Sequence, residues 1–200
     1  MPRSSKQAAA KTRGAVLDRA VDIGSAEGLE TLSIGRLAGE LRMSKIGVVG
    51  QFGSKLELQL AAIEAANRRF RAEVWDPVAA EPEGLPRLRA VMGSWISYLE
   101  REVFPGGCFL TAAAIEFDDR PGPVRDAIGN AWGLWMRVLE REVAVAQRAG
   151  DLGEYPGPAQ LAFELHSAVL GGNFARQLFG GEDALSPSRA AVARLLGHEP

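Results

Sequence analysis

The sequence has little of what most enzymes and secreted proteins need. Its single cysteine, Cys108, excludes an intramolecular disulfide, and two histidines leave little material for a catalytic or metal-binding cluster. No nucleophile elbow, P-loop or metal-ligand spacing is present. The longest apolar runs are short, such as residues 109–115, which Thr111 interrupts, and none approaches the ~20 residues that span a bilayer. We therefore expect a cytoplasmic protein that is no enzyme, contacts no membrane and needs no metal or cofactor.

Lysine is also scarce, and all four lysines fall within the first 55 residues. These residues carry nine basic and five acidic side chains, whereas residues 56–200 carry fourteen basic and twenty acidic ones. The net charge of −2 therefore conceals a basic N-terminal segment followed by an acidic remainder. Codon bias toward arginine would explain few lysines but not their clustering. The asymmetry is typical of a DNA-binding domain joined to a second domain.

Strand patterns are missing as well, because period-2 alternation is absent and β-branched residues are scattered. Apolar residues instead recur at helical spacing between Gly and Pro breaks, which predicts an all-α fold of about nine helices. The predicted helices cover approximately residues 12–27, 34–41, 45–52, 55–74, 85–103, 108–117, 121–149, 158–179 and 187–196. We expect a DNA-binding domain over residues 1–55, with 1–11 as a flexible basic arm, and a second domain over 56–200.

Residues 33–52 have the dimensions of a helix-turn-helix, with two short helices and a tight turn between them. Ser33 and Ser44 stand where each helix needs an N-cap. The core of such a unit requires apolar side chains at fixed places, and this segment supplies Ile34, Leu37, Ala38, Met43 and Val48. Spacing alone is not decisive, because any short helical hairpin would show the same pattern.

The phrase L-A-G-E-L-R-M-S-K at residues 37–45, followed by Phe52 and Lys55, resembles the N-terminal domain of the tetracycline-repressor (TetR) family. The resemblance covers about residues 11–60. It implies a helix-turn-helix domain and a helical ligand-binding and dimerisation domain, so the expected partners are double-stranded DNA, a small-molecule effector and a second copy. Two positions depart from the family pattern. Val49 replaces a Tyr that usually contacts phosphate, and Arg42 replaces the turn glycine, where a positive φ would be strained.

The resemblance and the chemistry of the side chains together give candidate DNA-binding residues. A hydroxyl at a helix N-terminus suits a phosphate, a lysine supplies a cation near the backbone, and an exposed isoleucine suits a thymine methyl group. The N-terminal basic side chains either follow phosphates or the minor groove, or belong to a disordered, solvated tail; they are Arg3, Lys6, Lys11 and Arg13. The candidate set is Ser33, Arg42, Ser44, Lys45, Ile46, Gly47, Val49, Gly50, Gln51 and Lys55.

The middle of the chain is rich in aromatic side chains, which form either an ordinary core or the lining of an effector pocket. His166 is either a core histidine or a polar anchor for the ligand, and Cys108 is either packing or a thiol sensor. Glu116, Asp118 and Asp119 lie together, but the Arg and Pro that follow favour helix capping over catalysis. The candidate ligand-binding residues are Met92, Trp95, Tyr98, Phe109, Phe117, Trp132, Trp135, Phe163 and His166.

Small residues on the last two helices suggest a two-fold interface, because adjacent glycines inside a helix are costly without a packing reason. The candidate interface residues are Ala168, Gly171, Gly172, Ala175, Val192 and Leu195. A symmetric dimer with recognition helices ~34–36 Å apart predicts a palindromic operator. The expected function is a repressor released from that operator by a small apolar effector. The alternative is a helical ligand-binding or interaction protein with weakened or lost DNA binding. The basis for this alternative is Val49, which replaces the Tyr that usually contacts phosphate.

Overall fold

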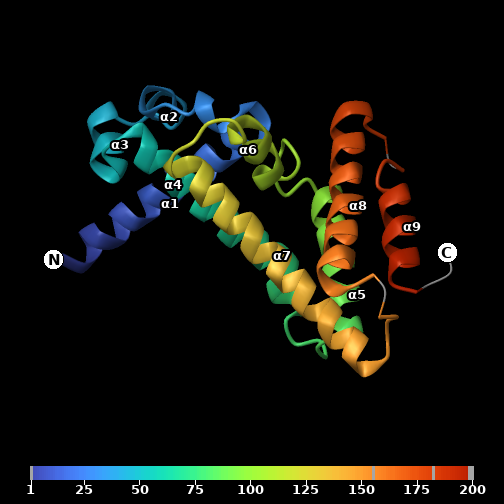
Figure 1. Cartoon of the computed structure of the whole chain (residues 1–200). Coiled ribbons are helices and arrows are strands. Elements are labelled where there is room, and N and C mark those ends of the chain that lie inside the picture. The colour runs from blue at the N-terminus through green and yellow to red at the C-terminus, as the bar shows by residue number, and fades with distance from the viewer. Residues whose placement is uncertain (1, 155, 182, 198–200) are drawn as a thin grey trace. The chain divides into compact units, whose positions relative to one another are not determined.

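A computed structural model describes residues 2–154, 156–181 and 183–197, except for the side chains of residues 2–6 and 8. Over these residues the protein has nine α-helices and no strand, which confirms the all-α prediction (Figure 1). The helices are α1 (Pro2–Glu27), α2 (Ile34–Glu40), α3 (Lys45–Phe52), α4 (Lys55–Phe70), α5 (Leu85–Glu100), α6 (Phe109–Phe117), α7 (Pro123–Ala149), α8 (Pro158–Phe179) and α9 (Ser186–Leu195). In the same described residues, none of the helices has the length and apolarity to cross a membrane.

The chain forms two compact units. Unit 1 contains residues 1–68 and 104–129, and unit 2 contains residues 69–103 and 130–200. These units differ from a simple division after residue 55, because α6 and the start of α7 fold with the N-terminal helices.

Unit 1 is built on α1, which buries Val16, Ala20 and Val21 at helical spacing. This helix begins at Pro2, ten residues earlier than predicted, so most of the predicted basic arm is helical. The side chains of Arg3 and Lys6 lie outside the described part of the chain, and the flexibility of the arm stays a prediction. Near its C-terminal end α1 packs against α6. A Cβ on Gly24 would lie 2.8 Å from the Phe109 ring, and a Cβ on Gly106 would overlap the Ser25 carbonyl oxygen.

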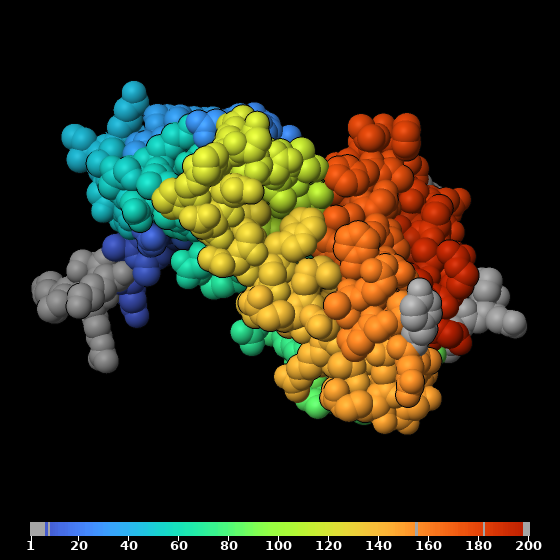
Figure 2. Space-filling view, viewed as in Figure 1, coloured from blue at the N-terminus to red at the C-terminus, as the bar shows by residue number. Residues whose placement is uncertain are grey.

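Unit 2 contains α5, α8, α9 and most of α7. The helices α8 and α9 lie side by side and form one continuous surface in the space-filling view (Figures 1 and 2). Gly172 permits this close packing, because a Cβ there would overlap the hydroxyl of Ser188 on α9. The hydroxyl of Ser188 donates to the Ala168 carbonyl oxygen at 2.8 Å and ties the two helices together. Gly172 and Val192 are therefore buried within a single chain.

Candidate functional site: nucleic-acid interface and aromatic cluster

The two short helices of the helix-turn-helix start where the serines predict. The Ser33 hydroxyl accepts the backbone N–H of Arg36 at 3.1 Å, and the Ser44 hydroxyl accepts that of Gly47 at 3.0 Å. Both serines therefore act as N-caps, which confirms that part of the expectation. Leu37 and Val48 are fully buried in this unit, and Ala38 is almost so.

The second short helix, α3, has one buried and one exposed face. Val48 and Phe52 are buried, whereas Ile46 is 85% exposed and Val49 is 42% exposed. Lys45 and Gly50 are exposed as well. Arg13 of α1 supports the helix from behind, since its guanidinium lies 4.3 Å from the Phe52 ring centre and donates to the Gln51 carbonyl oxygen. The exposed face of α3 thus combines a cation, an apolar side chain and a glycine that leaves the backbone accessible.

Two predicted DNA-binding residues have unusual local states. Arg42 has a φ of 53°, the left-handed conformation that its place in the turn demands. Lys55 lies at the start of α4, where its ammonium donates at 2.6 Å to both the Glu30 carbonyl oxygen and a Glu30 carboxylate oxygen. Arg42 is therefore a strained exposed cation, and the charge of Lys55 is engaged within the protein.

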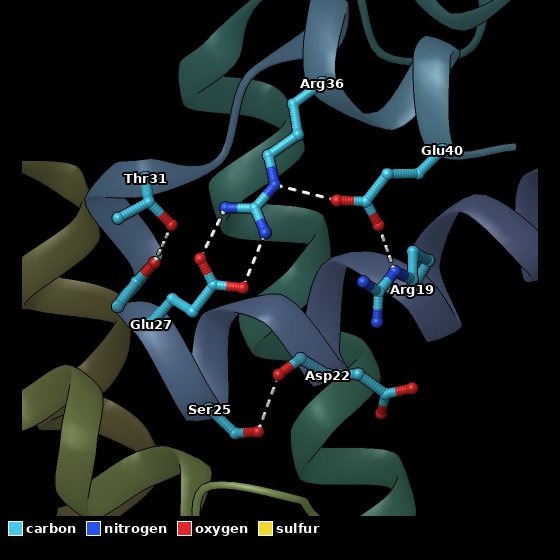
Figure 3. A network of polar contacts seen from close by, with 8 residues as sticks. Arg19, Asp22, Ser25, Glu27, Thr31, Arg36 and Glu40 are labelled. Carbon is cyan, nitrogen blue, oxygen red and sulfur yellow. Dashed lines mark hydrogen bonds and ion pairs between the residues drawn. The ribbon is translucent and has the colours of Figure 1, made fainter.

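Four charged side chains connect α1 to α2 (Figure 3). Arg36 donates to both carboxylate oxygens of Glu27, at 2.5 and 2.8 Å, and to Glu40 at 2.9 Å. The other oxygen of Glu40 pairs with Arg19. Hydrogen bonds from Arg36 hold the pKa of Glu27 and of Glu40 below the usual value. These ion pairs are exposed, so we assign them to the orientation of α2 on α1 rather than to stability.

The short 3₁₀ segment η1 (Leu29–Thr31), between α1 and α2, is held from two sides. On one side, the Glu116 carboxylate of α6 accepts the N–H groups of Leu29 and Glu30 at 2.6 and 3.0 Å. On the other, the Gln59 side chain of α4 donates to the Leu29 carbonyl oxygen at 3.2 Å, next to the Lys55 contact. The sequence predicts capping for Glu116 but gives no sign of its partner, which lies 87 positions away.

Unit 2 contains a cluster of six aromatic side chains, called the aromatic cluster below. The Trp95 and Trp135 rings meet edge to face with centroids 5.2 Å apart, and Phe70 contacts both. His166 lies 5.3 Å from Trp95 and 4.5 Å from Trp132. Burial lowers the pKa of His166 to about 4, so its imidazole is neutral at pH 7. The members are Phe70, Trp95, Tyr98, Trp132, Trp135 and His166.

The structure brings together only some of the predicted ligand-binding residues. Five of the nine belong to the aromatic cluster, and Phe70 joins them although it was not among the candidates. Phe109 and Phe117 belong to unit 1 instead, and Phe109 packs against Gly24 of α1. Phe163 is 58% exposed on α8, and Met92 is fully buried in α5. Within the described residues, no group of histidine, cysteine and acidic side chains has the arrangement of a metal site.

Comparison with known proteins decides the family. Residues 84–192 match the family model described as the tetracyclin repressor-like C-terminal domain. The chain belongs to the TetR family. The match lies in the C-terminal half, whereas the resemblance in the sequence rests on the N-terminal half, so the two observations are independent. No curated protein sequence matches the chain.

Solved structures of TetR proteins share the fold along nearly the whole chain. A TetR-family regulator from Cytophaga hutchinsonii is 21% identical, with a TM-score of 0.82 and 96% of each chain covered. One from Chloroflexus aurantiacus J-10-FL is 22% identical, with a TM-score of 0.83 and coverage of 95% of this chain and 94% of that one. AibR, solved in complex with isovaleryl coenzyme A and operator DNA, is 22% identical, with a TM-score of 0.71 and coverage of 92% and 98%.

In this TetR protein one face of α8 exposes large apolar side chains. Phe163, Phe174 and Leu178 are 58%, 40% and 74% exposed. At about 100° per residue they fall within an arc of about 60°, and Gly171, with open space around it, lies beside them. Of the predicted interface residues, Gly171 is exposed, Ala168, Ala175 and Leu195 are half-buried, and Gly172 and Val192 are buried within the chain.

Proposed function

We propose that this TetR protein is a ligand-responsive repressor, which binds a palindromic operator as a homodimer and leaves it when a small apolar effector binds. The observation that carries the proposal is the two-faced helix α3. Its buried Val48 and Phe52 fix it to the unit, and its other face presents Lys45, Ile46 and Val49 to solvent. An α-helix with such a face fits the major groove of B-DNA.

The chemistry of the exposed face suits DNA. Lys45 supplies a cation for a phosphate, and Arg42, in the turn that precedes α3, is a second exposed cation. Ile46 is the most exposed apolar side chain of the helix-turn-helix, and a thymine methyl group is the feature of the groove that it matches. We assign Lys55 a supporting role, since its ammonium holds Glu30.

The apolar face of α8 supports the proposed dimer. Large exposed patches of this kind mark interaction surfaces in soluble proteins. A second copy meeting the same face across a two-fold axis would cover Phe163, Phe174 and Leu178 and would allow close approach at Gly171. Phe174→Glu should therefore yield a monomer in sedimentation experiments, whereas Leu134→Glu, a matched change at an exposed position of α7, should not.

The link from effector to DNA runs, in this proposal, through α6. Glu116 fastens α6 to η1, and η1 leads directly into α2. A displacement of α6 would therefore move the first helix of the helix-turn-helix. AibR, which shares the fold, was solved with both an acyl coenzyme A and operator DNA. An effector that binds more tightly to an arrangement with lower DNA affinity weakens DNA binding, and linkage requires that DNA weakens effector binding by the same amount, typically ~1–3 kcal/mol.

The test is selection of bound sequences from random double-stranded DNA, followed by fluorescence anisotropy at several salt concentrations. We expect a palindromic site whose affinity falls steeply with salt. Lys45→Ala should reduce the slope of log affinity against log salt by about one, the value for one lost phosphate contact. Arg148→Ala, which removes an exposed cation at the end of α7 in unit 2, should leave the slope unchanged.

A ligand-binding or interaction protein without DNA binding is the competing function. The Val49 side chain favours it, because an aliphatic group donates no hydrogen bond to phosphate. If the selection enriches no sequence, and if binding to random DNA has no salt dependence, the repressor proposal is wrong and this alternative takes its place.

A further inference from the structure

Two tryptophans of the aromatic cluster have unusual polar groups. Trp95 is 2% exposed and Trp135 is 9% exposed, and the indole Nε1 of each is buried without a hydrogen-bond acceptor among the described residues. Buried indoles ordinarily find an acceptor for this N–H group. A buried N–H group without an acceptor costs about 1–3 kcal/mol. Here two such groups occur, on rings whose centroids are 5.2 Å apart.

The missing partner has a defined chemistry. An indole N–H only donates, so each tryptophan lacks an acceptor. None of the six cluster residues carries a formal charge at pH 7, since His166 is neutral. Transfer of an ion into surroundings of this kind is expensive, whereas transfer of an uncharged apolar molecule is favourable. The cluster therefore matches a neutral molecule with an oxygen acceptor and a mainly hydrocarbon or aromatic body.

We propose that the aromatic cluster binds an uncharged, mainly apolar molecule with a carbonyl or ether oxygen that accepts the indole N–H groups of Trp95 and Trp135. This inference rests on the proposed function, in which the bound molecule is the effector. His166 contributes a further neutral polar group, in ring contact with both Trp95 and Trp132. The hydrogen bonds give the site a preference for the oxygen, and the rings supply apolar contact.

A shape-matched pair of probes tests the proposal on the full-length protein. Acetophenone and α-methylstyrene differ only in that a methylene group replaces the carbonyl oxygen, and benzoate adds a negative charge. Titration calorimetry should show acetophenone binding at least tenfold more tightly than either of the other two. Equal affinities for acetophenone and α-methylstyrene, tighter binding of benzoate, or no binding of acetophenone up to about 10 mM would overturn the proposal, because the cluster would then not select a neutral molecule by its oxygen acceptor.

Variants locate the effect. Trp95→Phe and Trp135→Phe keep an aromatic ring but remove the N–H donor, and each should reduce the acetophenone preference to threefold or less. Trp75→Phe makes the same change outside the cluster, next to Arg87, and should leave the preference unchanged. A preference that survives both cluster variants contradicts the assignment, whether or not one of them is destabilised. Operator binding without ligand is measured separately. If the protein binds DNA but shows no preference for acetophenone, this inference is wrong and the proposed repressor function stands. If it shows the preference but does not bind DNA, the repressor function is wrong and the ligand site stands.

Discussion

The Glu116 carboxylate on α6 accepts the backbone N–H of Leu29 at 2.6 Å, and its second oxygen accepts that of Glu30 at 3.0 Å. Leu29 and Glu30 begin η1, so a side chain from the second half of the chain satisfies donors that this helical turn leaves open. A Cβ on Gly28 would lie 2.9 Å from the same carboxylate, which shows how closely the backbone approaches it. The contact fixes the segment between α1 and the helix-turn-helix.

Replacing Glu116 with Gln should destabilise the protein, because an amide has one acceptor oxygen for two N–H donors and turns its own N–H₂ toward the other. We expect a loss of about 1–2 kcal/mol in the free energy of unfolding, measured by urea denaturation. Glu140→Gln, the same change at an exposed position of α7, is the control and should change it by less than about 0.5 kcal/mol. Equal stability of the two variants would show that the Glu116 contact contributes nothing.

The adjacent glycines of α8 should respond in opposite ways to the same substitution. A Cβ on Gly172 would overlap Ser188 and approach Leu185, so Gly172→Ala must separate α8 from α9 and should cost about 1–3 kcal/mol. Around Gly171 nothing lies within 4 Å in the single chain, and Gly171→Ala should add up to about 1 kcal/mol through helix propensity. Thermal denaturation at a concentration where the chain is monomeric gives both values.

The Gly171 result also bears on the dimer. If α8 faces α8 of a second copy, Gly171→Ala should weaken the self-association measured by sedimentation while it stabilises the monomer. Unchanged self-association would place the dimer contact elsewhere.

Arg42 has a left-handed φ that glycine adopts without strain. Arg42→Gly should therefore stabilise the protein by up to about 1 kcal/mol, despite the loss of a side chain. Arg42→Ala is the matched control: it also removes the cation but keeps a Cβ and its strain, so it should give no such gain. If Arg42 contacts a phosphate, both variants weaken DNA binding equally and lower its salt dependence. If Arg42→Gly destabilises the protein instead, the side chain of Arg42 contributes more stability than its strained backbone costs.

Local signals in the sequence predicted the elements well, because caps and breaks act over a few residues. Ser33 and Ser44 cap their helices as expected, and the all-α class follows from apolar spacing alone. The predicted start of α1, at residue 12, was wrong because the prediction depended on a periodic pattern of apolar positions, which residues 2–11 lack. Contacts between distant segments gave no local signal: the Glu116 carboxylate at η1, the ion pair of Lys55 with Glu30, and Phe109 against α1 rather than with the tryptophans.

The same reasoning explains the mixed result at the candidate sites. An aromatic residue on a buried helix face has the same pattern whether it lines a ligand site or fills a core, so Trp95 and Phe109 could not be separated from sequence. Gly172 was expected at a dimer interface for its lack of a side chain, and the structure supplies a reason within one chain, the Ser188 hydroxyl. The large apolar side chains that α8 exposes to solvent are instead Phe163, Phe174 and Leu178.

His166 predicts how stability depends on pH. Its pKa is lowered from 6.5 to about 4 by burial, so between those values the unfolded chain binds a proton that the folded one does not. Stability from this group is complete above pH 6.5 and is lost as the pH falls toward 4, by roughly 3 kcal/mol in total. His166→Phe removes the titrating group and should flatten this part of the profile in urea denaturation at a series of pH values.

The glutamates with lowered pKa values titrate in a different pH range. Basic partners lower the pKa values of Glu27, Glu30 and Glu40, so these groups lose their stabilising effect only below pH 4.5. The change in stability between pH 5 and 6.5 therefore reports on the histidine. A wild-type slope equal to that of His166→Phe in this interval would mean that the imidazole takes up its proton in the folded protein as it does in the unfolded chain, and the cluster would then carry a charge below about pH 6.5.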